Sequence, residues 1–165
     1  MLMLKARFRE LQDRLLKEII SFYGSRLVSV VVFGSVARQT CRNDSDVDVL
    51  IIAEGLPTGR MKRVEEFSVI EERLEPFLKS LRDEGIDTCI SPVFKTPEEA
   101  EKKSPLFLDM VEDAVILFDR EDFFFNILEK LRNRLRELGA KRRWMANAWY
   151  WDLKPDYRPG EVIEL

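Results

Sequence analysis

The chain has 165 residues, of which 45% are hydrophobic and 35% charged, with 27 lysines and arginines against 30 aspartates and glutamates. This size and balance are typical of one globular domain and exclude disorder across the whole chain, and no apolar run approaches the length of a membrane-spanning helix. The sequence holds no histidine, which excludes Ser-His and Cys-His nucleophile systems and most transition-metal sites. Any catalysis must therefore use carboxylates, lysines or a hard metal ion.

The N-terminal residues and the cysteines favour a cytoplasmic protein. Polar residues at helical spacing follow the first nine residues, where a secretory signal would need an uninterrupted apolar stretch and a cleavage site. Cys41 and Cys89 are too few for a disulfide framework and belong to no C-x-x-C pair. We therefore expect two reduced thiols in the cytoplasm.

Hydrophobic periodicity and turn residues divide the chain into alternating helices and strands. We expect helices over residues 5–23, 61–84 and 124–138, strands over 26–33, 46–53, 86–94 and 114–118, and short helices starting at Thr96-Pro97 and Ser104-Pro105. This order predicts a domain of the α/β (α+β) class, in which helices flank a mixed sheet.

Two local patterns sharpen this prediction. Thr96 and Glu99 have the spacing of a capping box, with proline at the first helical position between them. Pro92 lies inside the third predicted strand, which indicates an edge position or a bulge because proline cannot donate to the sheet.

Beyond Gly139 the sequence changes character. Residues 1–139 are expected to form the domain, and residues 140–165 a basic and aromatic C-terminal extension with tryptophans at positions 144, 149 and 151. We expect this tail to cover apolar surface of the domain or of another copy of the chain. The sequence is therefore compatible with both a monomer and a homo-oligomer. The alternative is that its aromatic side chains stack on bases beside Lys141 to Arg143.

Asp46 and Asp48 stand one residue apart at the start of the second predicted strand. Since side chains alternate along a strand, both carboxylates point to the same side. They repel each other by on the order of 1 to 4 kcal/mol at intermediate dielectric, a cost that a bound cation reverses. Mg²⁺ prefers such oxygen ligands and combines one or two carboxylates with water and substrate phosphates.

The preceding strand ends at Gly34-Ser35, a pair suited to binding phosphate. Glycine allows close approach of the backbone, and Ser35 offers both an N–H and a hydroxyl group. Arg38 and Arg42 in the following polar link could neutralise polyphosphate oxygens or remain solvated loop charges.

Gly34-Ser35, ten intervening residues and Asp46-x-Asp48 lie within VVVFGSVARQTCRNDSDVDVLIIAE. This segment resembles the signature of the DNA polymerase beta-like nucleotidyltransferase superfamily, and within it the minimal nucleotidyltransferases of archaea and bacteria. The resemblance implies that Asp46 and Asp48 hold Mg²⁺ or Mn²⁺ and that Gly34 and Ser35 bind the phosphates of a nucleoside triphosphate. It also implies a third carboxylate on a neighbouring strand, for which Asp87 is the candidate as both catalytic residue and metal ligand.

The leading functional hypothesis is transfer of a nucleoside monophosphate, AMP from ATP, to a hydroxyl acceptor such as a protein side chain. The resemblance implies a helical partner of the HEPN-like toxin type, because several minimal nucleotidyltransferases act as antitoxins. One alternative is a catalytically weak module that binds nucleotide or a partner protein. Another is a modifier of RNA or tRNA ends, which the net charge of −3 disfavours.

Overall fold

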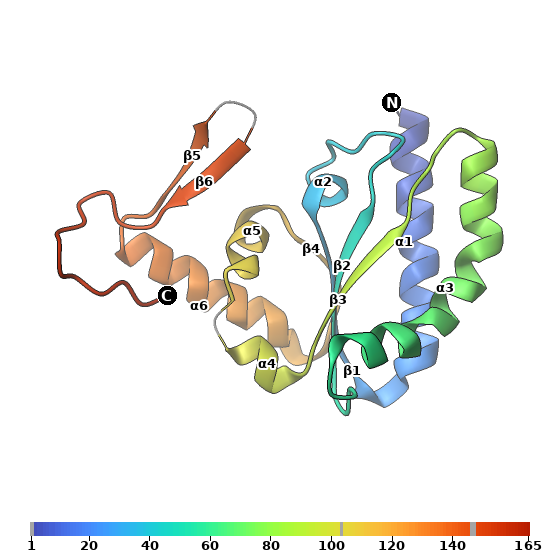
Figure 1. The fold of residues 1–165 in the computed structure, drawn as a ribbon, viewed down its shortest axis with the longest axis horizontal. Helices are drawn as coiled ribbons and strands as arrows, with labels where there is room; N and C mark the ends of the chain where they lie inside the picture. Colours follow the sequence, from blue (N-terminus) through green and yellow to red (C-terminus); the bar gives the residue numbers. More distant parts are fainter. Residues whose placement is uncertain (1, 103, 146–147) are drawn as a thin grey trace.

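The computed structural model describes residues 2–102, 104–145 and 148–165 (Figure 1). Its centre is a four-stranded sheet with the strand order β3-β2-β1-β4. Strand β1 is antiparallel to both β2 and β4, whereas β2 and β3 are parallel, so the sheet is mixed. The four strands are β1 (Leu27–Phe33), β2 (Val47–Ala53), β3 (Ile90–Lys95) and β4 (Val115–Asp119).

Helices cover both faces of this sheet (Figure 1). The helices α1 (Leu2–Tyr23) and α3 (Arg60–Asp83) lie on one face, and α4 (Pro97–Glu101), α5 (Leu106–Asp113) and α6 (Phe123–Glu137) lie on the other. The two central strands have apolar residues on both sides, since alternate side chains enter opposite cores. In β2, for example, Val49 and Ile51 belong to the core under α1 and α3, and Leu50 and Ile52 to the core under α5 and α6.

Asp119 joins the edge strand β4 to the last long helix. The hydroxyl of the fully buried Ser29 donates to the Asp119 carboxylate at 2.6 Å, and the backbone N–H groups of Phe124 and Phe125 donate to the same side chain at 3.0 and 2.9 Å. These bonds satisfy a buried hydroxyl and two free donors at the start of α6. Asp119 therefore has a structural role.

The predicted fold class and the expected elements of the domain are confirmed. The capping box at Thr96 and Glu99 forms, with both reciprocal hydrogen bonds present. Pro92 lies in β3, which is an edge strand of the sheet.

The largest error in a predicted boundary is in β3, which begins at Ile90 and not at residue 86. Strand β2 begins only at Val47, whose backbone N–H donates to the carbonyl of Cys89 at 2.9 Å, so among the four residues before β3 only Cys89 has a backbone hydrogen bond to β2. The backbone N–H of Asp87 instead donates to the carbonyl of Asn43, in the polar link, at 2.8 Å.

The C-terminal extension contains two strands that the sequence did not predict. Strands β5 (Lys141–Met145) and β6 (Ala148–Asp152) form an antiparallel hairpin. The indole N–H of Trp151 donates to the carbonyl of Leu108 in α5 at 3.1 Å, and Trp151, Leu153 and Leu165 pack against the core under α5 and α6. Within the described ranges, no helix is both long and apolar enough to cross a membrane.

Candidate active site

The turn after β1 holds the backbone close to a carboxylate from the neighbouring strand. Gly34 begins the single-turn helix α2 (Gly34–Ala37) with φ of +73°, a conformation that favours glycine. A Cβ atom at this position would lie 2.2 Å from Oδ2 of Asp48. Glycine is therefore required here for two reasons, the backbone conformation and the approach of Asp48.

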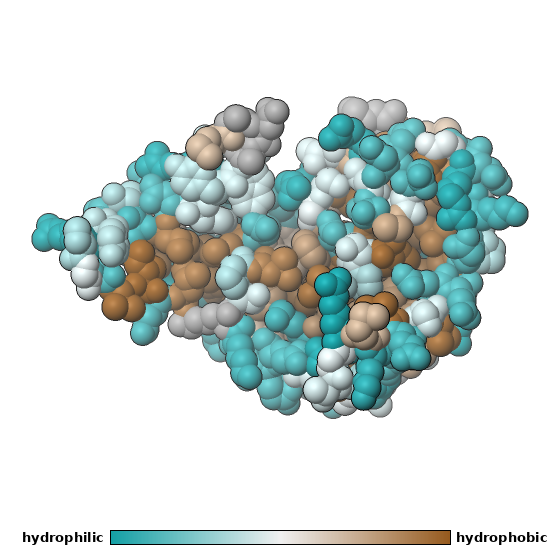
Figure 2. Space-filling view, in the orientation of Figure 1, coloured by the Kyte–Doolittle hydropathy of each residue, from teal (hydrophilic) through white to brown (hydrophobic). Residues whose placement is uncertain are grey.

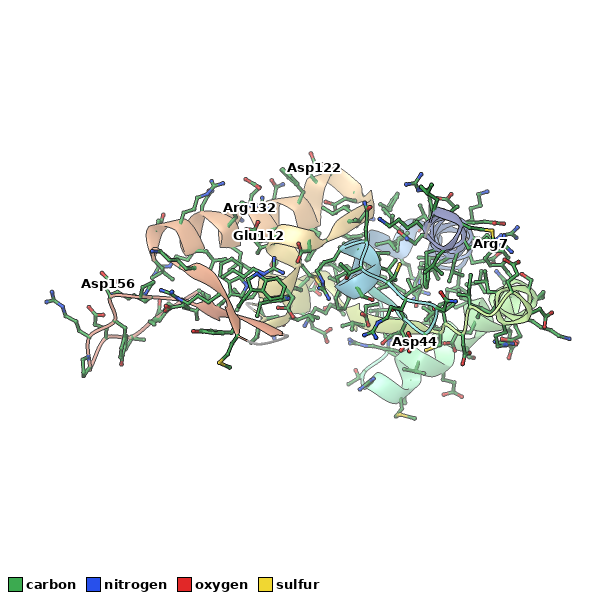
Figure 3. The ribbon with its side chains drawn as sticks, turned by 90° about the horizontal axis from the view of Figure 1, so that it is seen from above. Arg7, Asp44, Glu112, Asp122, Arg132 and Asp156 are labelled. Carbon is green, nitrogen blue, oxygen red and sulfur yellow. The ribbon has the colours of Figure 1, made fainter. Side chains whose placement is uncertain are left out.

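The same turn is closed by hydrogen bonds to its own carbonyls. The backbone N–H of Arg38 donates to the carbonyl of Gly34 at 3.1 Å, and that of Thr40 to the carbonyl of Ser35 at 3.0 Å. Gly34 thus lies beside Asp48, at the end of the sheet where β1 stops and β2 starts, and Ser35 is the next residue of the same turn. Figure 3 looks down on this end, with the polar link marked by Asp44.

Asp48 lies in β2, whereas Asp46 precedes the first residue of this strand. In β2 the even-numbered residues Leu50 and Ile52 enter the core under α5 and α6, so the carboxylate of Asp48 points to that side of the sheet. Burial raises the pKa of Asp48 above its usual value and the charge of Asp46 raises it further, while Ser91 and Arg38 oppose the rise. A cation between the two carboxylates would remove this repulsion.

Asp46 also contacts the residue just before β3. Oδ1 of Asp46 accepts from the backbone N–H of Cys89 at 3.3 Å and from its thiol at 3.0 Å. The hydrogen bond to Asp46, together with burial, raises the pKa of the Cys89 thiol to about 11. The thiol therefore stays protonated at neutral pH and remains a donor to Asp46.

The donor set fits a hard divalent ion. Among the described residues, no group of three or more histidine, cysteine or acidic side chains is close enough together to hold a metal by itself. Mg²⁺ commonly takes only one or two carboxylates and completes its coordination with water and substrate phosphates. Asp46 and Asp48, next to a turn suited to phosphate, match that requirement.

Asp87 lies at the same end of the sheet but apart from the pair. It is exposed, precedes β3, and is tied through its backbone to Asn43. In the register of β2 and β3, Ser91 is the residue opposite Asp48. A role for Asp87 as the third carboxylate stays a prediction.

The two predicted arginines face a hollow of about 810 Å³ beside the turn. Ser35, Arg38 and Arg42 line it from the domain, and Arg142 and Trp149 line it from the hairpin. No local pattern in the sequence could place these two hairpin residues beside a turn about a hundred positions earlier. A second hollow of about 960 Å³, between α4, α6 and the C-terminal residues, contains none of the predicted site residues.

Comparison with known proteins gives matches to sequences and to structures. Residues 13–118 match the family described as nucleotidyltransferase domain. The "Putative protein adenylyltransferase MJ1305" of Methanocaldococcus jannaschii is 31% identical over 128 residues, which cover 76% of this chain and 82% of that protein.

Two solved structures are more distant. A toxin–antitoxin complex with AMP-PNP matches at 15% identity and a TM-score of 0.47, covering 77% of this chain and 91% of that one. A complex of tri-AMPylated HEPN toxin from Shewanella oneidensis with MNT antitoxin matches at 14% identity and a TM-score of 0.42, covering 78% and 92%.

Proposed function

The chain belongs to the nucleotidyltransferase domain family and is a nucleotidyltransferase that uses a nucleoside triphosphate, and we propose that it transfers AMP from ATP to a hydroxyl group of a protein. The observation that carries the site assignment is the contact between Gly34 and Asp48. It supports the proposal because it joins the turn of Gly34 and Ser35, which we assign to the phosphates, to Asp48, which we assign to the metal ion, at one end of the sheet.

In the proposed reaction, each residue of the site has a separate task. Asp46 and Asp48 hold Mg²⁺ or Mn²⁺, and Gly34 and Ser35 bind the triphosphate through the backbone and the hydroxyl of the turn. Arg38 and Arg42 neutralise phosphate oxygens from the side of the hollow. When bound, the metal ion supplies positive charge that offsets the charge developing on the triphosphate.

The acceptor oxygen forms a new bond to the α-phosphorus while the bond between this phosphorus and the α–β bridging oxygen breaks. Pyrophosphate leaves, and the proton of the acceptor hydroxyl passes to a base. We assign this base to Asp87, which lies exposed at the same end of the sheet. Among the described residues, no three acidic side chains are close enough together to hold one metal ion. Asp87 would therefore have to approach Asp46 and Asp48 when the substrates bind.

The name of the archaeal relative supports a protein acceptor and AMP as the transferred group. The resemblance to minimal nucleotidyltransferases supports a helical toxin of the HEPN type as the protein that carries the acceptor hydroxyl. We place the reaction in the cytoplasm, where the two free cysteines would stay reduced.

The proposal is tested by incubating the protein and Mg²⁺ with a cell lysate and ATP labelled either at the α- or at the γ-phosphate. We expect label in protein from α-labelled ATP and none above background from γ-labelled ATP, since the β- and γ-phosphates leave as pyrophosphate. Label in RNA alone would contradict the protein acceptor and favour the end-modifying alternative. Absence of label from every fraction would contradict the enzyme and favour a binding module.

A further inference from the structure

The hollow beside the phosphate-binding turn has two walls from distant parts of the chain. Ser35, Arg38 and Arg42 form one wall, and Asp113, Arg142 and Trp149 form the other. Figure 1 shows the β5–β6 hairpin and α2 on either side of this region, and Figure 2 shows the surface hollowed between them. Its volume of about 810 Å³ lies within the range of sites that bind cofactor-sized molecules.

Arg142 is held in this hollow from two directions. One amino group of its guanidinium donates to the carboxylate of Asp113, at the end of α5, at 2.7 Å. The centre of the guanidinium lies 3.8 Å from the centroid of the Trp149 ring, which is a close cation–π contact. The side chains of Arg142 and Asp113 are each only 21% exposed. Arg142 is therefore fixed before any ligand binds.

The contacts of Arg142 leave part of its hydrogen-bonding capacity unused. Asp113 accepts from Nη2, and the buried Nε has no partner within the described part of the chain. The neighbouring Arg143 differs, because its guanidinium donates to Asp152 on the adjacent strand at 2.9 Å and does not line the hollow. The two consecutive arginines thus point to different sides of the hairpin.

The charges around the hollow favour an anion. Arg38, Arg42 and Arg142 line it together with a single carboxylate, that of Asp113. Asp109, exposed on α5, is a second carboxylate within electrostatic reach of Arg38 and Arg142. The lining of the hollow itself thus carries three guanidinium groups against one carboxylate, while Asp48 beside the turn, also within electrostatic reach of Arg38, is one of the two carboxylates assigned to the metal ion.

We propose that the C-terminal hairpin completes the nucleotide site, with Arg142 binding the triphosphate and Trp149 holding its guanidinium in place. This inference rests on the proposed function, because it takes the turn of Gly34 and Ser35 as the phosphate site. The Arg38 guanidinium lies 5.9 Å from the centroid of the same Trp149 ring, so arginines from the domain and the hairpin flank one surface. A polyphosphate on the turn would meet both.

The test is calorimetric binding of inorganic tripolyphosphate and of adenosine to wild-type protein and three variants. We expect Arg142→Gln to weaken tripolyphosphate binding by about 10- to 100-fold, because it removes a hydrogen bond between charged groups. Adenosine binding should stay unchanged. Arg143→Gln is the matched control and should change neither by more than about twofold, because Arg143 faces Asp152.

Asp113→Asn separates ligand binding from the stability of the hairpin. Both Asp113→Asn and Arg142→Gln break the same ion pair, but only the second removes the guanidinium. Tripolyphosphate should therefore bind Asp113→Asn at least as tightly as wild type. Equal weakening in these two variants, or no weakening in Arg142→Gln, overturns the inference, as does wild-type protein that binds no tripolyphosphate.

The outcome is independent of whether transfer occurs. Binding of tripolyphosphate that depends on Arg142, in a protein that labels no acceptor, would uphold the hairpin inference and contradict the proposed function. Transfer of label together with unchanged ATP affinity in Arg142→Gln would uphold the function and contradict the hairpin inference.

Discussion

Replacing Gly34 by alanine should lower the transfer rate about 100-fold with only a modest loss of stability. The added Cβ would lie 2.2 Å from Oδ2 of Asp48, so the two atoms must separate by at least about 0.8 Å to reach the 3.0 Å below which such contacts essentially never occur. Displacement of a reacting group by about 1 Å can cost about 100-fold in rate, or about 2.7 kcal/mol of activation free energy. The left-handed backbone should cost alanine about 1 to 2 kcal/mol of stability.

Gly55→Ala is the matched control for this change. Gly55 has a similar φ of +64°, but a Cβ there meets only Cδ of Arg26 at 3.9 Å, an ordinary contact. Urea unfolding should show comparable losses of stability for both variants, and transfer of label from α-labelled ATP should fall only in Gly34→Ala. Equal transfer rates in the two variants would refute the requirement for Asp48 to approach the turn.

The remaining predictions concern a carboxylate of the site and an ion pair remote from it. Asp87→Asn should lower the transfer rate at least about tenfold if Asp87 accepts the proton. The control Asp44→Asn, in the polar link, should leave the transfer rate nearly unchanged. Equal rates in the two variants would show that Asp87 is not the base. The hydrogen bond from Arg63 is the main cause that lowers the pKa of Glu99 from 4.5 to about 2 in the folded protein. The ionised Glu99 therefore stabilises the folded protein above pH 4.5, and this stabilisation is lost as the pH falls towards 2. Glu99→Gln should therefore lower the unfolding free energy by about 1 kcal/mol at pH 7, with a difference that shrinks below pH 4.5; a constant difference down to pH 2 would contradict the assignment.

The sequence predicts the fold and the motif well because both depend on local patterns. The valines of β1 and the apolar run of β2 alternate between two cores, and this same alternation brings Asp48 to the side of the sheet under α5. The motif spacing then places Gly34 beside Asp48, since β1 and β2 pair antiparallel around the polar link.

The sequence does not predict features that depend on contacts between distant segments. The sequence predicts the start of β3 at residue 86, but of the residues before Ile90 only Cys89 pairs with β2, and Asp87 pairs with the polar link. The hairpin was missed because β5 begins with three consecutive basic residues and lacks the alternation of apolar and polar side chains that marks a half-buried strand. Its position beside the turn depends on the contacts of Trp151 with Leu108 and of Arg142 with Asp113.

The central claim is that Asp46 and Asp48 together support nucleotide transfer. It is tested most directly by comparing wild-type protein with the Asp46→Asn/Asp48→Asn double variant in Mg²⁺-dependent transfer of label from α-labelled ATP into protein. The double variant should stay folded, because it loses a pair of like charges, and should transfer no label above background. Transfer at the wild-type rate by the folded double variant would contradict the assignment of the site.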